Sequence, residues 1–376
     1  GAPNADLVHG AWLQGQGEDL GELVSVQAMR AMDASNTELA AREQALLAQH
    51  GRRWLGYFAK YPHTWRFGFV DSLVITEATR EDLVELHNLV AARFLRAVEL
   101  ELLGHRTFEN CNLISALAEV GMPPVVRKLT LAPSTSSPRA IDVGSLRAIW
   151  PRLARLEELT IKAGNVGFAD LALPNATSVW ITTNASREVL APLTNAVWPK
   201  LSSLTIELTA YPYERVEIAI LEPLLLALSE SSTVRHLAIT QHYQANALLE
   251  LLIGVPLFKS LTSLSLSQGG MNAEGAKLLL EESARFAHLE KIDLSECYLP
   301  KETAEALKKR YGARIDVERQ REAYPTYGEG DAGDGEGEGM DEYDDDEAAL
   351  PPAPVAPVAP AGPRPRTGNP VDDEDD

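Results

Sequence analysis

The sequence is poor in cysteine, in aromatic residues and in long apolar runs. Only two of its 376 residues are cysteines, Cys111 and Cys297. They lie too far apart in sequence to suggest a disulfide framework. No apolar stretch approaches the ~20 residues that a membrane-spanning helix needs, and no signal peptide is visible. These absences make a cytoplasmic protein in a reducing setting the default expectation, with no membrane partner.

Basic residues are scarce relative to acidic ones, and the imbalance is local. The chain holds 34 Lys and Arg against 54 Asp and Glu, a formal net charge of −20. Residues 328–376 contain 16 of these acids and two of the bases, which accounts for −14, so residues 1–327 carry only −6. Neither part offers the positive field that nucleic acid or anionic lipid requires. We therefore expect no nucleic-acid partner.

Motifs of known catalytic and metal sites are absent as well. The sequence contains no H-E-x-x-H, C-x-x-C, G-x-S-x-G or G-x-x-x-x-G-K-[ST]. The acidic stretch DAGDGEGEGMDE (331–342) has glycine at its third and fifth positions, where a calcium-binding loop needs oxygen ligands. Both cysteines are predicted to be packed side chains rather than reactive thiols. The sequence thus predicts no catalytic residue, no metal site and no cofactor.

One recurring hexamer, apolar-x-x-apolar-x-apolar, dominates what is present. Nine copies begin at residues 70, 95, 126, 156, 176, 201, 234, 261 and 289. Segments with helical periodicity separate most of them, for example 81–94, 217–231 and 273–288. Each unit predicts one short strand followed by one helix, and stacked units bury a continuous core that a single unit cannot.

These hexamers and their spacing resemble leucine-rich repeats, over roughly residues 70–317. LEKIDLSECYL (289–299) matches the longer repeat pattern, with Cys297 at its Asn/Cys position. The spacing and the helical segments look most like the ribonuclease-inhibitor type. The resemblance implies an α/β solenoid with a curved parallel sheet, which we assign to residues 67–318, and LKKRYGARIDV (307–317) is expected to form its last helix and closing strand.

Residues 1–66 are predicted to form a small helical domain. Ser35 and Glu38 have the spacing of a capping box, and Gly51 has the position of a C-cap. Residues 7–27 resemble the bacterial repeat-companion domain that precedes leucine-rich repeats. The residues that match that family's pattern are Trp12, Leu13, Gly17, Gly21, Glu22 and Gln27. The helix that precedes this pattern in the family is mostly missing, so the domain is expected to be truncated at its start. The resemblance implies an architecture and no defined activity.

Residues 319–376 are predicted to be a disordered tail. Its first part is rich in Gly, Asp and Glu, and its second part is rich in proline. Because the segment has almost nothing to bury, it cannot offset the entropy cost of ordering.

The alternation of the strands gives the most specific expectation. Positions four and six of each hexamer point into the solenoid, so positions three, five and seven point outward, onto the concave surface that such arrays use for binding. Trp180, at position five of its strand, is the only large aromatic residue among the outward positions, and a register error of one residue would turn it into the core. The candidate partner-binding residues are Trp180, Thr160, Thr205, Ser178, Thr182, His236, Glu158 and Glu207.

Two functions follow from these patterns. The first is a non-enzymatic scaffold that binds a protein partner on the concave face, where Trp180 has the character of an interface hot spot. The alternative is that the acidic tail is the main functional element and binds a basic protein surface, with the solenoid as its carrier. An enzyme with an unrecognised site is a remote third reading.

Overall fold

A computed structural model of the chain describes residues 3–104, 107–134, 137–184, 186–209, 218–231 and 233–322. These residues belong to one compact unit. The predicted tail beyond Glu322 therefore lies outside the described residues. Among the described helices, none is long and apolar enough to cross a membrane.

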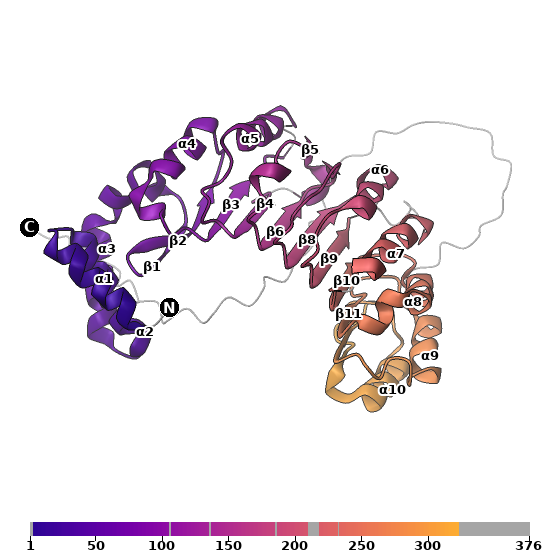
Figure 1. Ribbon diagram of the computed structural model, residues 1–376. Helices are drawn as coiled ribbons and strands as arrows, with labels where there is room; N and C mark the ends of the chain where they lie inside the picture. Colours follow the sequence, from indigo (N-terminus) through magenta and orange to yellow (C-terminus); the bar gives the residue numbers. More distant parts are fainter. Residues whose placement is uncertain are drawn as a thin grey trace, which may run out of the picture. The chain divides into compact units, whose positions relative to one another are not determined.

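An 11-stranded sheet forms the centre of this unit (Figure 1). Its strands, in spatial order, are β1 (His63–Arg66), β2 (Phe69–Ile75), β3 (Ala97–Glu101), β4 (Lys128–Ala132), β6 (Glu158–Lys162), β8 (Ser178–Thr183), β9 (Ser203–Leu208), β10 (His236–Thr240), β11 (Ser263–Ser265), β12 (Lys291–Asp293) and β13 (Ile315–Asp316). β1 is antiparallel to β2, and every later neighbour is parallel. Each of the nine hexamers contributes one strand, and the predicted closing strand is β13. The repeating parallel strands fit a leucine-rich-repeat solenoid.

From β2 to β12 the register of the sheet follows the repeat positions without a slip. Position-five residues pair across neighbouring strands, as Thr160, Trp180 and Thr205 do on β6, β8 and β9. Positions four and six are buried in all nine units. These residues are Leu73, Ile75, Val98, Leu100, Leu129, Leu131, Leu159, Ile161, Val179, Ile181, Leu204, Ile206, Leu237, Ile239, Leu264, Leu266, Ile292 and Leu294. The predicted inward face of the strands is therefore confirmed.

Helices cover the face of the sheet that carries these buried residues, and they lie on the outer side of its curve (Figure 1). The α-helices of the array are α4 (Arg80–Asn88), α5 (Thr107–Val120), α6 (Arg187–Leu190), α7 (Glu222–Ser231), α8 (Ala245–Gly254), α9 (Ala273–Glu281) and α10 (Lys301–Tyr311). The 3-10 helices are η1 (Gly56–Lys60), η2 (Val90–Ala92), η3 (Pro138–Ala140), η4 (Trp150–Arg152), η5 (Ala191–Asn195), η6 (Ile218–Ile220), η7 (Pro256–Ser260) and η8 (Gly312–Arg314).

Two units lack the predicted α-helix. After β4 and after β6 the chain instead forms β5 (Asp142–Ser145) and β7 (Asn165–Gly167), which pair as a separate two-stranded sheet. Pro133, Pro138 and Pro151 lie between β4 and β6, and proline interrupts a helix because it lacks the amide donor and clashes with the preceding turn. Between β6 and β8 only residues 163–177 are available, which is too short for a strand and a helix together.

The N-terminal helices are α1 (Pro3–Gly15), α2 (Asp19–Met32) and α3 (Thr37–Leu55). The expected capping box is wrong by one residue, because the side chain of Asn36, not Ser35, caps α3 by accepting the Leu39 N–H at 3.1 Å. The helix also continues past Gly51 and ends before Gly56, whose φ of +55° glycine adopts without strain. β1, which pairs with β2, lies within the region predicted to be helical.

A small core of its own joins these helices to the first strands. It contains Leu20, Leu23, Val24, Val26, Leu46 and Phe69, and Trp54 and Trp65 pack against both this core and the main one. Two residues of the family resemblance have structural roles here. A Cβ atom on Gly21 would lie 2.5 Å from the Gln14 nitrogen, so glycine is required where α1 and α2 meet. Gln27 accepts the Gly68 N–H at 2.6 Å and donates to Glu43 at 2.7 Å.

In two units, the ninth residue of the repeat lies in the turn after the strand and its side chain bonds to the unit before it. Cys297 is fully buried, with Sγ 3.4 Å from the Leu266 carbonyl oxygen, and burial raises the pKa of its thiol to about 11. Gln320 has the same position after β13 and donates to the Leu294 carbonyl at 2.9 Å. The expectation that Cys297 is a packed residue of the turn is confirmed.

His242 occupies this ninth position after β10, where repeats of this kind carry Asn or Cys. Its side chain is 1% exposed, and Nδ1 accepts the Gln244 N–H at 3.0 Å. Nε2 makes no hydrogen bond to any described residue. Burial lowers the pKa of His242 to about 4, because the imidazolium would lose its hydration without gaining a partner.

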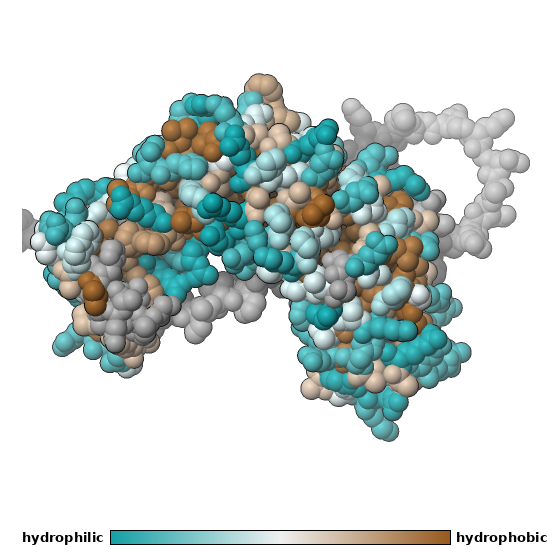
Figure 2. All heavy atoms as spheres, viewed as in Figure 1, coloured by the Kyte–Doolittle hydropathy of each residue, from teal (hydrophilic) through white to brown (hydrophobic). Residues whose placement is uncertain are grey.

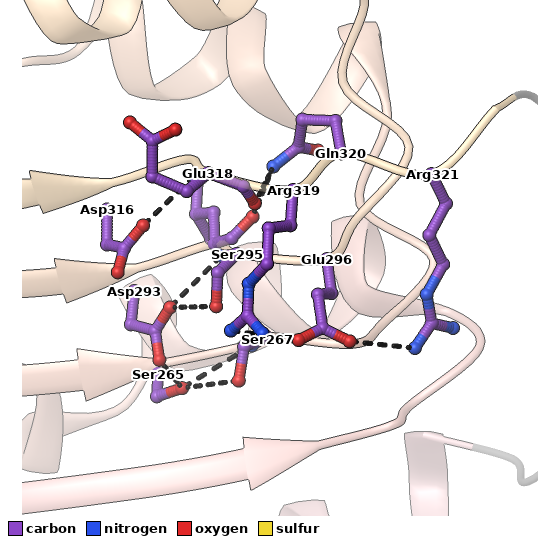
Figure 3. A network of polar contacts seen from close by, with 11 residues as sticks. Ser265, Ser267, Asp293, Ser295, Glu296, Asp316, Glu318, Arg319, Gln320 and Arg321 are labelled. Carbon is purple, nitrogen blue, oxygen red and sulfur yellow. Dashed lines mark hydrogen bonds and ion pairs between the residues drawn. The ribbon is translucent and has the colours of Figure 1, made fainter. Parts of the chain in front are cut away.

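The described chain continues past the predicted domain boundary at residue 318. The Arg319 guanidinium lies 3.0 Å from a Glu296 carboxylate oxygen, and the Arg321 N–H donates to the Cys297 carbonyl at 2.7 Å. These contacts hold residues 319–321 against the last repeat (Figure 3).

Candidate functional site on the strand face

The residues at positions three, five and seven of the units that contain β2, β3, β4, β6 and β8–β12 form one surface, the strand face. Four of its position-seven residues are buried: Ala132, Thr182, Ser267 and Ser295. Trp180 is 40% exposed on it, whereas its neighbours Val179 and Ile181 are 1% and 0% exposed. The predicted direction of this side chain is therefore confirmed. Because the side chains of a strand alternate between its two faces, the buried residues on both sides of Trp180 direct it outward.

Small hydroxyl side chains surround Trp180. Thr160 and Thr205 lie directly opposite it on the two neighbouring strands, and Ser178 precedes it by two residues on the same face. The Lys162 ammonium lies 5.3 Å from the centre of the indole ring, within the range of a cation–π contact. The ring is thus held among short neighbours that leave it accessible.

Glu207 is the acidic centre of this region. Its Oε2 accepts hydrogen bonds from Trp180 Nε1 at 3.4 Å and from Thr182 Oγ1 at 2.8 Å, and its Oε1 accepts one from Gln241 Nε2 at 2.6 Å. All three donors are neutral, and no cation of the described residues pairs with this carboxylate. The network fixes Glu207 beside the exposed edge of Trp180.

The structure brings most of the predicted residues together around Trp180, and the surroundings of three of them differ from the rest. Thr182 is 1% exposed and bonded to Glu207, so it positions that carboxylate and does not present a contact surface. Glu158 forms an ion pair with Lys128 at 3.1 Å and is not free to meet a partner's charge. His236 is exposed, but it lies on β10, two strands from Trp180.

Two residues of the site were missing from the predicted set. Lys162 stood at position seven beside Trp180, and the sequence pattern alone could have included it. Gln241 follows β10 with a φ of +60°, an uncommon conformation for a residue other than glycine. Its reach back to Glu207, on the neighbouring strand, has no signature in the repeat pattern.

A second polar network lies on the last strands (Figure 3). Asp293 Oδ2 accepts the Ser265 hydroxyl at 2.9 Å, and Oδ1 accepts the backbone N–H and the hydroxyl of Ser295 at 3.0 and 2.7 Å. Like Glu207, Asp293 is supported by neutral donors only, without a cationic partner among the described residues. Asp316 continues the same position on β13, where it accepts the Glu318 N–H at 3.0 Å.

This arrangement offers stacking, hydrogen bonds and negative charge. Among the described residues, no group of three or more His, Cys, Asp or Glu could hold a metal ion. On the side of the molecule drawn in Figure 2, hydrophobic surface forms separate patches and no continuous one. The strand face therefore has the chemistry of a binding surface.

Comparison with known proteins adds evidence on the fold alone. No protein-family model matches the chain, and no curated protein matches it. A protein of Bacteroides fragilis with a known crystal structure is similar over 76% of this chain and 85% of its own length, with 19% sequence identity and a TM-score of 0.59. An internalin from Listeria monocytogenes aligns over 72% of this chain and 93% of its own length, with 14% identity and a TM-score of 0.27. The first likeness supports the fold, and the second is too weak to carry an argument.

Proposed function

We propose that this chain is a non-enzymatic scaffold that binds a protein partner on the strand face, with Trp180 at the centre of the contact. The observation that carries the proposal is the 40% exposure of Trp180 on a face otherwise made of small and polar side chains. Tryptophan is enriched among residues that dominate binding energy, especially where near-neutral contacts surround it. Thr160, Thr205 and Ser178 are neighbours of that kind.

The magnitude available at Trp180 is sufficient for such a role. A tryptophan side chain presents up to about 250 Å², so covering the exposed two-fifths removes about 100 Å² from water. At ~25 cal/mol per Å² this contributes about 2.5 kcal/mol. The hydrogen bond to Glu207 and the contact with Lys162 hold the ring in place, which reduces the entropy that a partner must remove.

The proposal also covers the type of repeat and the identity of the N-terminal helices. The array is of the ribonuclease-inhibitor type, and the N-terminal helices are a repeat-companion domain that closes the first end of the solenoid core. The packing of Trp54 and Trp65 against both cores supports this role. The two free cysteines are in keeping with a cytoplasmic setting.

The test is capture of partners from native lysate by the full chain, followed by affinity measurement with the purified partner. Trp180→Ala should weaken binding by about 2 kcal/mol or more, a change of at least ~30-fold. Phe108→Ala is the matched control, because Phe108 is a 75% exposed aromatic residue on α5, away from the strand face. Equal affinity of the Trp180 variant and the wild type would exclude Trp180 from the interface.

A further inference from the structure

We propose that the partner segment bound on the strand face is cationic, and that an arginine of that segment contacts Trp180 and Glu207. The proposed function supplies the place of binding, and this inference adds the chemistry of the partner. It rests on three features of the described residues: the charge of the face, carboxylates that lack a counter-ion, and an exposed aromatic ring beside one of them.

The charge of the strand face is negative. Its positions three, five and seven hold three lysines and five acidic residues. Lys128 and Glu158 form an ion pair and cancel, which leaves two lysines against four acids. Complementary charge speeds association and selects among partners, and it favours a cationic segment here.

Glu207 and Asp293 are preorganised to accept one more donor each. A carboxylate offers about four acceptor positions, and three neutral donors occupy three of them at each residue. Neutral donors orient the carboxylates but leave their charge uncompensated. A cationic donor from a partner would complete both sites with charge-assisted hydrogen bonds, which are the stronger kind.

Arginine fits the Trp180 site better than lysine does. Its planar guanidinium both stacks on an aromatic ring and donates to a carboxylate, whereas an ammonium is a compact point charge. Trp180 and Glu207 share a hydrogen bond, so one guanidinium can reach both. Lys162 already lies 5.3 Å from the ring centre, which indicates that the ring accepts a cation and also identifies the charge beside Trp180 that opposes the partner.

The spacing of the two carboxylates suggests an extended partner. Glu207 on β9 and Asp293 on β12 are three strands apart, about 14 Å at ~4.8 Å per strand, and they are offset by two residues along the strands, about 7 Å, so their backbone positions are separated by about 16 Å. Basic residues four to six positions apart in an extended segment span about 13–20 Å. A second copy of this chain is excluded as occupant by its own −20 charge, and the −14 of residues 328–376 excludes the tail.

The experiment uses the full chain labelled with 5-fluorotryptophan and observed by fluorine NMR. The chain has six tryptophans, of which none lies in residues 323–376, so every tryptophan resonance belongs to residues 1–322. Trp180→Phe assigns the Trp180 resonance. The probes are a short peptide of alternating arginine and glycine and its counterpart of alternating glutamate and glycine.

We expect the arginine peptide to shift the Trp180 resonance saturably and the glutamate peptide to leave it unchanged. Glu207→Gln should weaken this response by roughly tenfold, and Lys162→Gln should strengthen it. Glu188→Gln, which removes a charge from exposed α6, is the matched control and should have no effect. A fixed Trp180 resonance with the arginine peptide, or a shift with the glutamate peptide, would overturn the inference.

The two proposals fail in different ways. If a captured partner is lost on Trp180→Ala but binds Glu207→Gln as well as wild type, the strand face is the interface and the cationic partner is wrong. If the partner binds Trp180→Ala unchanged, the proposed function itself is wrong.

Discussion

Lowering the pH should reduce the free energy of unfolding of the solenoid, because it protonates His242, a buried residue in the turn after β10. The ring is neutral in the folded chain because burial lowers its pKa from the ordinary 6.5 to about 4. The unfolded chain therefore binds a proton that the folded chain refuses, and stability falls as the pH drops below 6.5 towards 4. Between pH 7.5 and pH 5.0 this difference amounts to about 2 kcal/mol.

The informative variant is His242→Asn, because Asn is a usual residue at this position and its amide oxygen can accept the Gln244 N–H in place of Nδ1. Urea unfolding, followed by circular dichroism at several pH values, gives the free energy of unfolding for both chains. The wild type should lose about 2 kcal/mol more than the variant over this pH range. Other titrating groups act on both chains and cancel in the comparison. Parallel pH profiles would refute the assignment of this loss to His242.

Two further predictions concern buried groups. Asn110→Ala should lower the free energy of unfolding by about 2–4 kcal/mol, because the Asn110 amide is 2% exposed and makes three hydrogen bonds, two to the Leu103 backbone and one to the Asp142 carbonyl. A loss below about 1 kcal/mol in urea unfolding would contradict that reading. In the native chain at pH 8, a thiol reagent should modify Cys111 and spare Cys297, because Cys297 is buried and its pKa is raised to about 11. Mass spectrometry of the labelled peptides checks this, and equal labelling of both cysteines before unfolding would exclude it.

The strands and their register could be predicted from the sequence. Side chains alternate between the two faces of a strand, so the burial of one face fixes which residues lie on the other. The apolar residues at positions four and six fix the direction of every outward side chain, which is why Trp180 is correctly placed on the strand face. The same pattern could not reveal that Thr182 is buried, because its burial involves a contact with the side chain of Glu207 on the neighbouring strand, which accepts the Thr182 hydrogen bond. Side-chain contacts between units are not encoded in the period of a single unit.

The segments between the strands were predicted less well. Helical periodicity identified α4, α7 and α9, but it extended α4 and α9 beyond their observed ends and began α7 before its observed start at Glu222. The pairing of β5 with β7 could not be foreseen, because each strand is short and gains its partner from a different unit. The N-cap of α3 is a local choice between two adjacent residues, Ser35 and Asn36, and the geometry of the preceding turn decides it.

The strands of the strand face are parallel and in register, so residues of successive units are regularly spaced across it. Each unit adds one strand, so the separation across the sheet between two residues of the strand face grows by about 4.8 Å with each strand between them. Duplicating or deleting one whole unit between β9 and β12 would move Glu207 and Asp293 apart or together by one such step, while each carboxylate kept its own hydroxyl donors. A change in the number of repeats could thus alter the spacing of the partner charges that the strand face binds, without altering the Glu207 site or the Asp293 site.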